Sequence, residues 1–497
     1  MKVLMLNSNR FREIPAIPFG MCCVATAIED AGHDVKALDL FFSKSCVSDM
    51  SDIIKEYGPE VIGITIRNLD NASVINPEFL LEPIKKDIID PLKKMFSGTI
   101  VIGGPAVGIN GPEMLSYFDL KFAIRGDGEA AIVEFLKRIE SKIPMDGMEG
   151  LIMRDGDDIV EDNPPMFVMD INSLPFAKPY KYVDVNGYKK LTTPLQIQTK
   201  RGCALKCTYC TYNRIEGTKY RIRDPQYVAD EIEHLVKETG INHIGVMDSI
   251  FNLPLSHAKD VLRAIADKKM KLKLTAMEIS PAGVDQEFVD LLKEFKIEYV
   301  IMCAEAGSDT TLKGLGKNFT KADIFRAAKL LRKAKITMVW SLLLGAPGET
   351  EETVIETLDT IKKASSMRDM VSIAVGIRIY HKTPISEMIE LKNSFYPRDN
   401  YLFPASYTPE GISMERMRYL AMRAALIHPN YYLLGMRGPS PFLISTTKII
   451  NMILRMNQNP FIIHMVFKRL QNLMGMGFVK RFIFDYKNKD LLENAQL

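Results

Sequence analysis

Three cysteines lie within eight residues of one another in the stretch "TKRGCALKCTYCTYNR", which spans residues 199–214. Cys203, Cys207 and Cys210 form the spacing C-x3-C-x2-C. Thiolates are ligands for soft metal centres, and three of them on one short loop can hold three corners of an iron–sulfur cluster. The fourth iron would then lack a protein ligand, which leaves a position where a small molecule can bind and be reduced.

A structural zinc site is the main alternative for these cysteines. Zinc in such a site has four ligands, and residues 190–233 contain no histidine and no fourth cysteine. The nearest candidate, His234, falls on a predicted helix. A simple electron-transfer cluster would also use four cysteines. The spacing therefore favours a cluster with one open iron.

The rest of the composition excludes several classes of protein. The other cysteines, Cys22, Cys23, Cys46 and Cys303, lie in apolar surroundings and are expected to be buried, reduced side chains. A net charge of +3 over 497 residues gives no basic field for nucleic acid. The first residues resemble neither a signal peptide nor a transit peptide, and no apolar run is long enough to span a membrane. A cytoplasmic location is expected.

The elements that must position the cysteines form a repeat of strands and helices. Strand-like runs occur at 194–199, 243–248, 272–277, 299–304, 337–344 and 371–379, and each gap between them contains a helical pattern. One helix is well marked, with Asp224 as N-cap, Pro225 in the first turn and Gly240 as the stop. This α/β pattern predicts a parallel barrel of six units, which is too few to close, over residues 191–390. The cysteines follow its first strand, where loops carry catalysis.

A second α/β unit is predicted over residues 1–144. Apolar runs at 2–7, 34–40, 60–66, 98–104 and 121–126 are continuous enough to be buried on both faces of a parallel, doubly wound sheet. Such sheets bind ligands beyond the carboxyl ends of their strands. Residues 145–190 are expected to be a linker that contains a hairpin, with Asp-Gly at its turn.

The last segment, 391–497, is predicted to be mainly helical. The run "FIIHMVFKRLQNLMGMGFVKRFIF" mixes apolar with basic residues, as a helix on an anionic membrane surface or around an apolar substrate would. An accessory helical domain packed on the barrel is the alternative. Membrane association and a lipid-like substrate therefore stay open beside a small-molecule substrate.

The cysteine motif, with the aromatic Tyr209 inside it and a six-unit barrel behind it, resembles the radical S-adenosylmethionine (SAM) superfamily. The segments 221–232, 247–252, 303–317, 342–350 and 378–385 resemble the strand ends of that family. The resemblance implies a [4Fe-4S] cluster whose open iron binds SAM and whose electron produces a 5′-deoxyadenosyl radical. It also implies an external electron donor of the flavodoxin or ferredoxin type. The SAM-contacting residues it suggests are Tyr209, Glu278, Glu305, Gly345, Pro347 and Arg378.

The first domain resembles the Rossmann-like cobalamin (B12)-binding domain that precedes many radical SAM domains. The matching segments are 18–39 and 101–136. The cobalamin-binding residues this suggests are Thr65, Arg67, Gly103, Gly104, Pro105, Gly126 and Glu129. The family motif Asp-x-His-x-x-Gly is absent, and His33 is the only histidine in 1–150. We therefore expect base-off cobalamin without a histidine ligand, with Arg67 facing the lower side of cobalt.

Together the resemblances imply a cobalamin-dependent radical SAM methyltransferase, similar to the class B enzymes. Its expected reaction transfers a methyl group from methylcobalamin to an unactivated carbon after the 5′-deoxyadenosyl radical has removed a hydrogen atom. Cyclisation or rearrangement without methyl transfer is the first alternative, because it would use the same cofactors. A non-catalytic corrinoid or iron–sulfur carrier is the alternative from another class. Substrate identity, catalytic acid–base residues and oligomeric state are not predicted.

Overall fold

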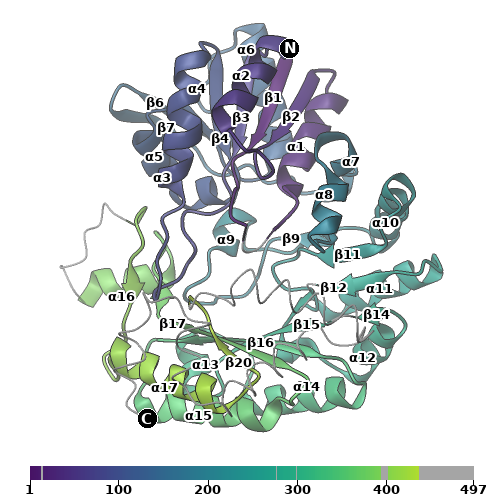
Figure 1. The fold of residues 1–497 in the computed structure, drawn as a ribbon, viewed down its shortest axis with the longest axis vertical. Coiled ribbons are helices and arrows are strands. Elements are labelled where there is room, and N and C mark those ends of the chain that lie inside the picture. Colours follow the sequence, from purple (N-terminus) through teal and green to yellow (C-terminus); the bar gives the residue numbers. More distant parts are fainter. Residues whose placement is uncertain (13–14, 276, 298, 393–400, 436–497) are drawn as a thin grey trace.

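The computed structural model describes residues 1–12, 15–275, 277–297, 299–392 and 401–435. Two α/β units are stacked, with the N-terminal sheet above the barrel in Figure 1. The carboxyl ends of the N-terminal strands face the barrel. Both predicted α/β units are thus confirmed, and the described part of the C-terminal segment packs against the barrel.

The N-terminal sheet has seven strands in the order β2-β1-β3-β4-β5-β6-β7. Its parallel part consists of β1 (Lys2–Asn7), β2 (Asp34–Asp39), β3 (Val61–Thr65), β4 (Thr99–Gly103) and β5 (Phe122–Ile124). The direction of the strand order reverses between β1 and β3, which creates a crevice at their carboxyl ends. The sequence places Asn7, Thr65 and Gly103 at this edge.

Helices cover both faces of this sheet. One face carries α1 (Phe19–Asp30) and α6 (Gly128–Ser141), whose apolar side chains form one core with the sheet. The other face is covered by α2 (Cys46–Tyr57), the segments α3 (Leu81–Ile84), η1 (Lys85–Ile89) and α4 (Asp90–Met95), and α5 (Pro105–Phe118). Strands β1 and β3 are almost fully buried between these layers, as their continuous apolar runs predicted, whereas the edge strand β2 is partly exposed.

The predicted hairpin is present but belongs to the first sheet. Strands β6 (Leu151–Asp155) and β7 (Asp158–Asp162) pair with each other, and β6 pairs antiparallel with β5. The sequence-based assignment of these residues to the linker is therefore corrected. The physical reason is that β5 would otherwise present an open edge, which the hairpin covers.

The barrel strands follow one another in chain order and run parallel. They are β8 (Leu195–Ile197), β11 (His243–Val246), β12 (Lys273–Thr275) with β13 (Met277–Ile279), β15 (Val300–Glu305), β16 (Met338–Leu344) and β17 (Met370–Val375). The short β14 (Lys296–Ile297) lies beside β12. In the described residues the edge strand β8 pairs only with β11, so the six predicted strands form an open barrel.

Helices on the outside of the barrel connect these strands. They are α10 (Pro225–Thr239), α11 (Leu255–Asp267), η3 (Pro281–Gly283), α12 (Gln286–Lys293), α13 (Asp309–Gly314), α14 (Lys321–Lys333) and α15 (Glu351–Ala364). Helix α10 begins and ends as predicted. The Asp224 carboxylate accepts hydrogen bonds from the N–H groups of Gln226 and Tyr227, and Gly240 adopts a left-handed conformation with φ 65°.

The described C-terminal residues are partly helical, as expected, but they also extend the barrel sheet. Helix α17 (Met414–Ile427) is followed by β20 (Tyr431–Leu433), which pairs parallel with β17. Helix α16 (Pro384–Lys392) and the short ladder of β18 (Ile377–Arg378) with β19 (Ser406–Tyr407) complete this end. The segment 461–484, on which the membrane prediction depends, lies outside the described residues.

Short elements join the two units. The connector contains η2 (Ile171–Ser173), α7 (Pro179–Tyr182) and α8 (Val185–Lys190). Strands β9 (Lys200–Arg201) and β10 (Arg221–Ile222) bracket the cysteine loop, which contains α9 (Tyr212–Ile215). In the opposite direction, the loop between β3 and α3 descends from the first domain to the level of β17 (Figure 1). On this loop, the carbonyl of Val74 accepts a hydrogen bond from Arg418 at 3.2 Å.

Candidate active site between the two domains

Backbone hydrogen bonds hold the cysteine loop on several sides. The N–H of Cys203 donates to the carbonyl of Gly217 at 3.0 Å, and the N–H of Cys210 donates to that of Cys207 at 3.3 Å. Between them, Thr208 donates its N–H to Leu315 and accepts from the N–H of Ile385, each at 3.0 Å. The loop is therefore a fixed part of the barrel mouth.

The three thiols are suited to a cluster. Cys203 and Cys207 are buried and Cys210 is half-buried. Burial raises the pKa of the Cys207 thiol and raises that of Cys210 to about 12, so bound metal must stabilise their thiolates. Across the described residues, no three His, Cys, Asp or Glu side chains converge closely enough for a single metal ion. In an iron–sulfur cluster, in contrast, each of the three thiolates binds a different iron, so the three sulfur atoms need not converge on one point.

A charged group lies next to the cysteine loop. The ammonium of Lys317 is 2.6 Å from the Glu305 carboxylate and donates to the Tyr209 hydroxyl at 3.1 Å. Glu305 ends β15 with φ 53°, a strained conformation for a side chain larger than glycine. Burial, followed by the charge of Glu305, raises the pKa of nearby Glu278 to about 7. The carboxyl groups of Glu278 and Glu305 have one positively charged partner, Lys317. The three side chains together can therefore accept one further cation.

Three of the residues predicted to contact SAM, namely Tyr209, Glu278 and Glu305, therefore lie close together in the structure. Lys317 was not among the predicted site residues, although it is the last residue of the segment 303–317, which resembles a strand end of the family. Its proximity to Glu305 depends on how the chain returns after α13, which the local pattern does not reveal.

Gly345 and Pro347 lie in the turn after β16. The carboxylate of Glu349 accepts hydrogen bonds from the N–H groups of Gly345 and, at 3.0 Å, Ala346. Gly345 has φ 111°, and a Cβ there would approach Gly376 to 3.3 Å, so glycine suits this position. Burial raises the pKa of Glu349 to about 7. Because β15 and β16 are parallel, this turn lies at the same end of the barrel as Glu305.

Arg378 contacts both domains, and its partner Asp70 lines the cavity between them. Its guanidinium donates to the Asp70 carboxylate at 2.7 Å and to the carbonyl of Tyr401 at 2.9 Å, and a further bond reaches Ile379. These partners use its donors, and Asp70 comes from the first domain. Arg378 therefore joins the two domains, and its contact with SAM stays a prediction.

A cavity of about 570 Å³ lies between the two domains. All seven residues predicted to bind cobalamin line it, namely Thr65, Arg67, Gly103, Gly104, Pro105, Gly126 and Glu129. The barrel supplies further lining residues that sequence reasoning did not identify, including Gln196, Gln198, Arg201, Tyr212 and Glu216. Thr211 and Tyr212, the first two residues after Cys210, are part of the wall, so the cysteine loop leads directly into this cavity.

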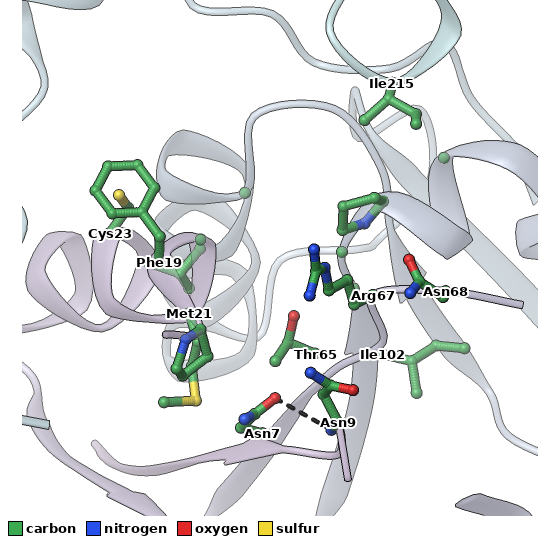
Figure 2. A pocket seen from close by; sticks show the side chains of 18 of the residues that line it. Asn7, Asn9, Phe19, Met21, Cys23, Thr65, Arg67, Asn68, Ile102 and Ile215 are labelled. Atoms are coloured by element: carbon green, nitrogen blue, oxygen red, sulfur yellow. Dashed lines mark hydrogen bonds between the residues drawn. The ribbon is translucent and has the colours of Figure 1, made fainter. Parts of the chain in front are cut away.

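Arg67 is the unusual residue of the cavity. Figure 2 shows its side chain among the lining residues, near Thr65. Within the described residues its guanidinium has neither an ion pair nor a hydrogen-bond partner, and burial lowers its pKa. A half-buried cation without a partner is costly, which makes Arg67 a candidate for contact with a ligand.

Two glycines let the backbone approach the cavity. Gly104 has φ 99°, and a Cβ there would lie 2.7 Å from the carbonyl oxygen of Ile66. Gly126 has φ 92°, and a Cβ would lie 2.2 Å from the carbonyl oxygen of Met166. Neither position accepts a side chain without a backbone shift.

Ion pairs close one side of the cavity. Arg201 of the barrel lies 2.5 Å from Glu129 and 3.0 Å from Asp127 of the first domain, and Arg221 also pairs with Asp127. Glu129, predicted to bind cobalamin, thus has a barrel arginine as its partner. These contacts, which join residues about 70 to 94 positions apart, fix the orientation of the two domains.

Comparison with known proteins agrees with this arrangement. Residues 197–361 match the family model of the radical SAM superfamily, and residues 13–136 match that of the B12 binding domain. The fold and the site thus define a radical SAM protein with an N-terminal B12-binding domain. More particularly, the chain belongs to the cobalamin-binding radical SAM family, because both domains occur in it in this order.

Two curated relatives cover most of the chain. An uncharacterised methyltransferase, PH0819 of Pyrococcus horikoshii, is 25% identical, and the alignment covers 70% of this chain and 73% of that protein. The tryptophan 2-C-methyltransferase of Streptomyces laurentii is 24% identical, with coverages of 76% and 72%.

Solved structures show the same fold. TsrM from Kitasatospora setae, described as a radical SAM methyltransferase with cobalamin and a [4Fe-4S] cluster bound, has a TM-score of 0.77 at 24% identity, covering 87% of this chain and 92% of that one. The cobalamin-dependent SAM radical enzyme OxsB has a TM-score of 0.73 at 14% identity, covering 99% and 74%.

Proposed function

We propose that this enzyme transfers a methyl group to an unactivated carbon of a small-molecule substrate. The observation that carries the proposal is the continuity of the site. The cysteine loop passes directly from Cys210 into the wall of a cavity that is lined by the predicted cobalamin residues. When bound, cobalamin supplies the methyl group, and the cluster supplies the electron that cleaves SAM. A shared cavity would keep both reactions away from water.

The side chains of the protein have distinct proposed roles. Cys203, Cys207 and Cys210 hold the cluster. Glu278 and Glu305 provide negative charge for the ammonium group of SAM, and Lys317 holds Glu305 in place at 2.6 Å. The turn that contains Gly345 and Pro347 offers backbone groups for the adenine.

The names of the relatives support methyl transfer. Besides the two described above, a cytidylyl-2-hydroxyethylphosphonate methyltransferase and a hopanoid C-3 methylase also match the chain. An alternative without methyl transfer, such as cyclisation, is favoured by relatives named anaerobic magnesium-protoporphyrin IX monomethyl ester cyclase. Both reactions fit the cavity, so the fate of the methyl group must separate them.

For the substrate and the location of the protein, we propose only broad classes. We retain a lipid-like molecule as one class of substrate and peripheral membrane contact through the C-terminal segment. Both rest on the sequence of 461–484 alone. In the part of the chain that the structure describes, no helix is sufficiently long and apolar to cross a membrane.

Isotopic labelling tests methyl transfer. After anaerobic reconstitution with iron, sulfide and cobalamin, the enzyme is incubated with candidate substrates and SAM carrying a deuterated methyl group. We expect 5′-deoxyadenosine, S-adenosylhomocysteine and a product that contains the deuterated methyl group, measured by mass spectrometry. A modified product without deuterium, formed together with 5′-deoxyadenosine, would favour cyclisation or rearrangement.

The proposed base-off state of cobalamin, with Arg67 below cobalt, gives a spectroscopic prediction. His33 donates no ligand, because it lies before β2 and its ring is 3.2 Å from the N-terminal ammonium of Met1. The described residues that line the cavity include no histidine. We therefore expect the electron paramagnetic resonance spectrum of bound cobalt(II) to show no nitrogen hyperfine splitting. An Arg67→His variant should gain this splitting.

The same experiment can contradict the proposed coordination of cobalt. Nitrogen splitting in the unsubstituted enzyme would exclude the proposed coordination. An Asn68→His variant is the control, because it places an imidazole on the neighbouring residue of the same cavity. If both histidine variants lack splitting while cobalamin remains bound, Arg67 does not face cobalt.

A further inference from the structure

Lys317 is a buried cation beside the cysteine loop. Its side chain is 6% exposed, and its ammonium lies 2.6 Å from the Glu305 carboxylate and 3.1 Å from the hydroxyl oxygen of Tyr209. The ammonium is also 5.4 Å from the centre of the Tyr209 ring, which is close enough for a cation–π interaction. Tyr209 lies between Cys207 and Cys210 in the sequence. These contacts therefore bring a positive charge to the segment that holds the cluster.

The end of helix α13 directs Lys317 to this place. The N–H of Lys317 donates to the carbonyl of Leu312 at 2.9 Å, and the N–H of Gly316 donates to that of Lys313 at 3.0 Å. Gly316 has φ 70°, so the two bonds form the Schellman motif that ends many helices at a glycine. The chain therefore leaves the helix in a fixed direction, with Lys317 as the first residue after the turn.

This turn packs directly on the cysteine loop. A Cβ on Gly316 would lie 2.5 Å from the carbonyl oxygen of Lys206 and 3.5 Å from the Cα of Cys207. The N–H of Thr208 donates to the carbonyl of Leu315 at 3.0 Å. The backbone that precedes Lys317 is thus in contact with the backbone of a cluster ligand, and a side chain at position 316 would separate the two.

The ammonium of Lys317 also reaches the sulfur of Cys207. Burial raises the pKa of the Cys207 thiol, whereas the charge of Lys317 and a hydrogen bond from its ammonium act in the opposite direction. A lysine ammonium has three protons to donate, and burial is costly unless they have partners. Glu305, Tyr209 and Cys207 provide three partners, which explains how this lysine can be buried.

A cation in this position changes the energy of cluster reduction. Reduction adds one negative charge to a unit that already holds three thiolates. A nearby positive charge in a poorly hydrated place stabilises the reduced form more than the oxidised form. Hydrogen bonds to the sulfur atoms and the net charge of the surroundings are also among the factors that set the potential of an iron–sulfur cluster.

We propose that Lys317 raises the reduction potential of the cluster through its charge and its hydrogen bond to the Cys207 sulfur. This inference deepens the proposed function and rests on it, because the cluster must be reduced before it can cleave SAM. In this step the cluster takes one electron from a one-electron reductant, and its charge falls from 2+ to 1+. The charge of Glu305 partly offsets that of Lys317. The ammonium of SAM would bring a second cation to Glu278 and Glu305, so the effect of Lys317 should be larger with SAM present.

The test is a redox titration of the reconstituted holoenzyme with titanium(III) citrate, followed by electron paramagnetic resonance of the reduced cluster. The potential that half-reduces the unsubstituted cluster is the reference. At this potential we expect the ratio of reduced to oxidised cluster in Lys317→Met to fall about tenfold, which is a shift of about 59 mV for one electron. The fall should be larger with SAM present. Lys317→Arg retains the charge and should retain most of the potential.

A double variant guards against damage to the fold. Lys317→Met leaves Glu305 buried without its charged partner, whereas Lys317→Met/Glu305→Gln removes both charges together. The double variant should still show a lowered potential, because the hydrogen bond to Cys207 is lost in it as well. Iron and sulfide content shows that each variant holds a complete cluster.

Lys259→Met is the matched control. The Lys259 side chain is 12% exposed and pairs with Asp285 at 2.7 Å and Glu287 at 2.6 Å, but it belongs to α11 on the outside of the barrel. Its removal should leave the potential unchanged. An equal shift in this control would overturn the proposal.

Two results in the Lys317 variants would also overturn it. One is an unchanged potential in Lys317→Met with a complete cluster. The other is weaker SAM binding with no change in the potential of the SAM-free cluster, because Lys317 would then act on SAM alone. Failure of the proposed methyl transfer is distinguishable from both, since the titration without SAM requires no substrate and no turnover.

Discussion

A Cys207→Ala variant is expected to fold and to bind cobalamin but to contain no [4Fe-4S] cluster and to form no 5′-deoxyadenosine. The thiol at this position is buried, and the loop around it is held by backbone hydrogen bonds that alanine leaves in place. Loss of one small side chain costs about 1 kcal/mol of folding free energy. Loss of one of three thiolates, in contrast, removes an iron ligand that no other group replaces. Iron and sulfide content, visible absorbance and chromatography of SAM cleavage products measure the result.

Cys46→Ala is the matched control for this variant. Cys46 is also a buried thiol, 5% exposed against 8% for Cys207, but it begins α2 and packs in the core of the first domain. Its removal should cost a similar folding free energy and leave the iron content at the level of the unsubstituted enzyme. Production of 5′-deoxyadenosine by Cys207→Ala would mean that the cluster is bound elsewhere.

Local patterns predicted much of this fold because local physics determines those parts. The cap residues of α10, the Asp-Gly turn of the hairpin and the continuous apolar strands all follow from a few adjacent residues. The cysteine loop was identified for the same reason. Its ligands lie within eight residues, so their spacing alone indicates the metal centre.

Contacts between distant parts of the chain were not predictable in this way. The partner of Arg378 is Asp70, which lies 308 positions earlier, and no local pattern links the two. The pairing of β20 with β17 and that of β6 with β5 also depend on which edges the folded sheets leave open. Sequence reasoning therefore suggested Arg378 as a SAM contact but could not reveal that it pairs with the first domain.

The same distinction applies within the cavity. The segments after β3, β4 and β5 could be predicted because parallel strands end at one edge of a sheet. The barrel side could not, since Arg201 and Glu216 reach the cavity only through the docking of the two domains. The orientation of the domains is thus part of the active site, and the charges that fix it should matter for cobalamin binding.

An Asp127→Asn variant tests that dependence. The Asp127 side chain is 4% exposed and pairs with Arg201 at 3.0 Å and with Arg221. Without its charge, Glu129 alone would balance two buried guanidinium groups, which leaves one unpaired. Removing one partner of a buried ion pair costs about 3 kcal/mol or more. We expect a matching loss in the free energy of unfolding, measured by denaturant titration, together with weaker cobalamin binding, because Gly126 and Glu129 flank this residue in the cavity wall.

Asp119→Asn is the matched control, because Asp119 also pairs with two basic side chains, Lys93 and Arg154, within the first domain. Its side chain is 65% exposed, so water screens both pairs and their removal should cost about 1 kcal/mol at most. An equal loss of unfolding free energy in the two variants would show that burial of the ion pairs between the domains does not add to the stability of the protein. A large loss in Asp127→Asn with unchanged cobalamin affinity would show that the ion pairs stabilise the fold without shaping the cavity. We expect a large loss of stability and weaker cobalamin binding in Asp127→Asn and neither effect in Asp119→Asn. The reason is that the Asp127 carboxylate joins the cavity wall to β9 and β10, the strands that bracket the cysteine loop.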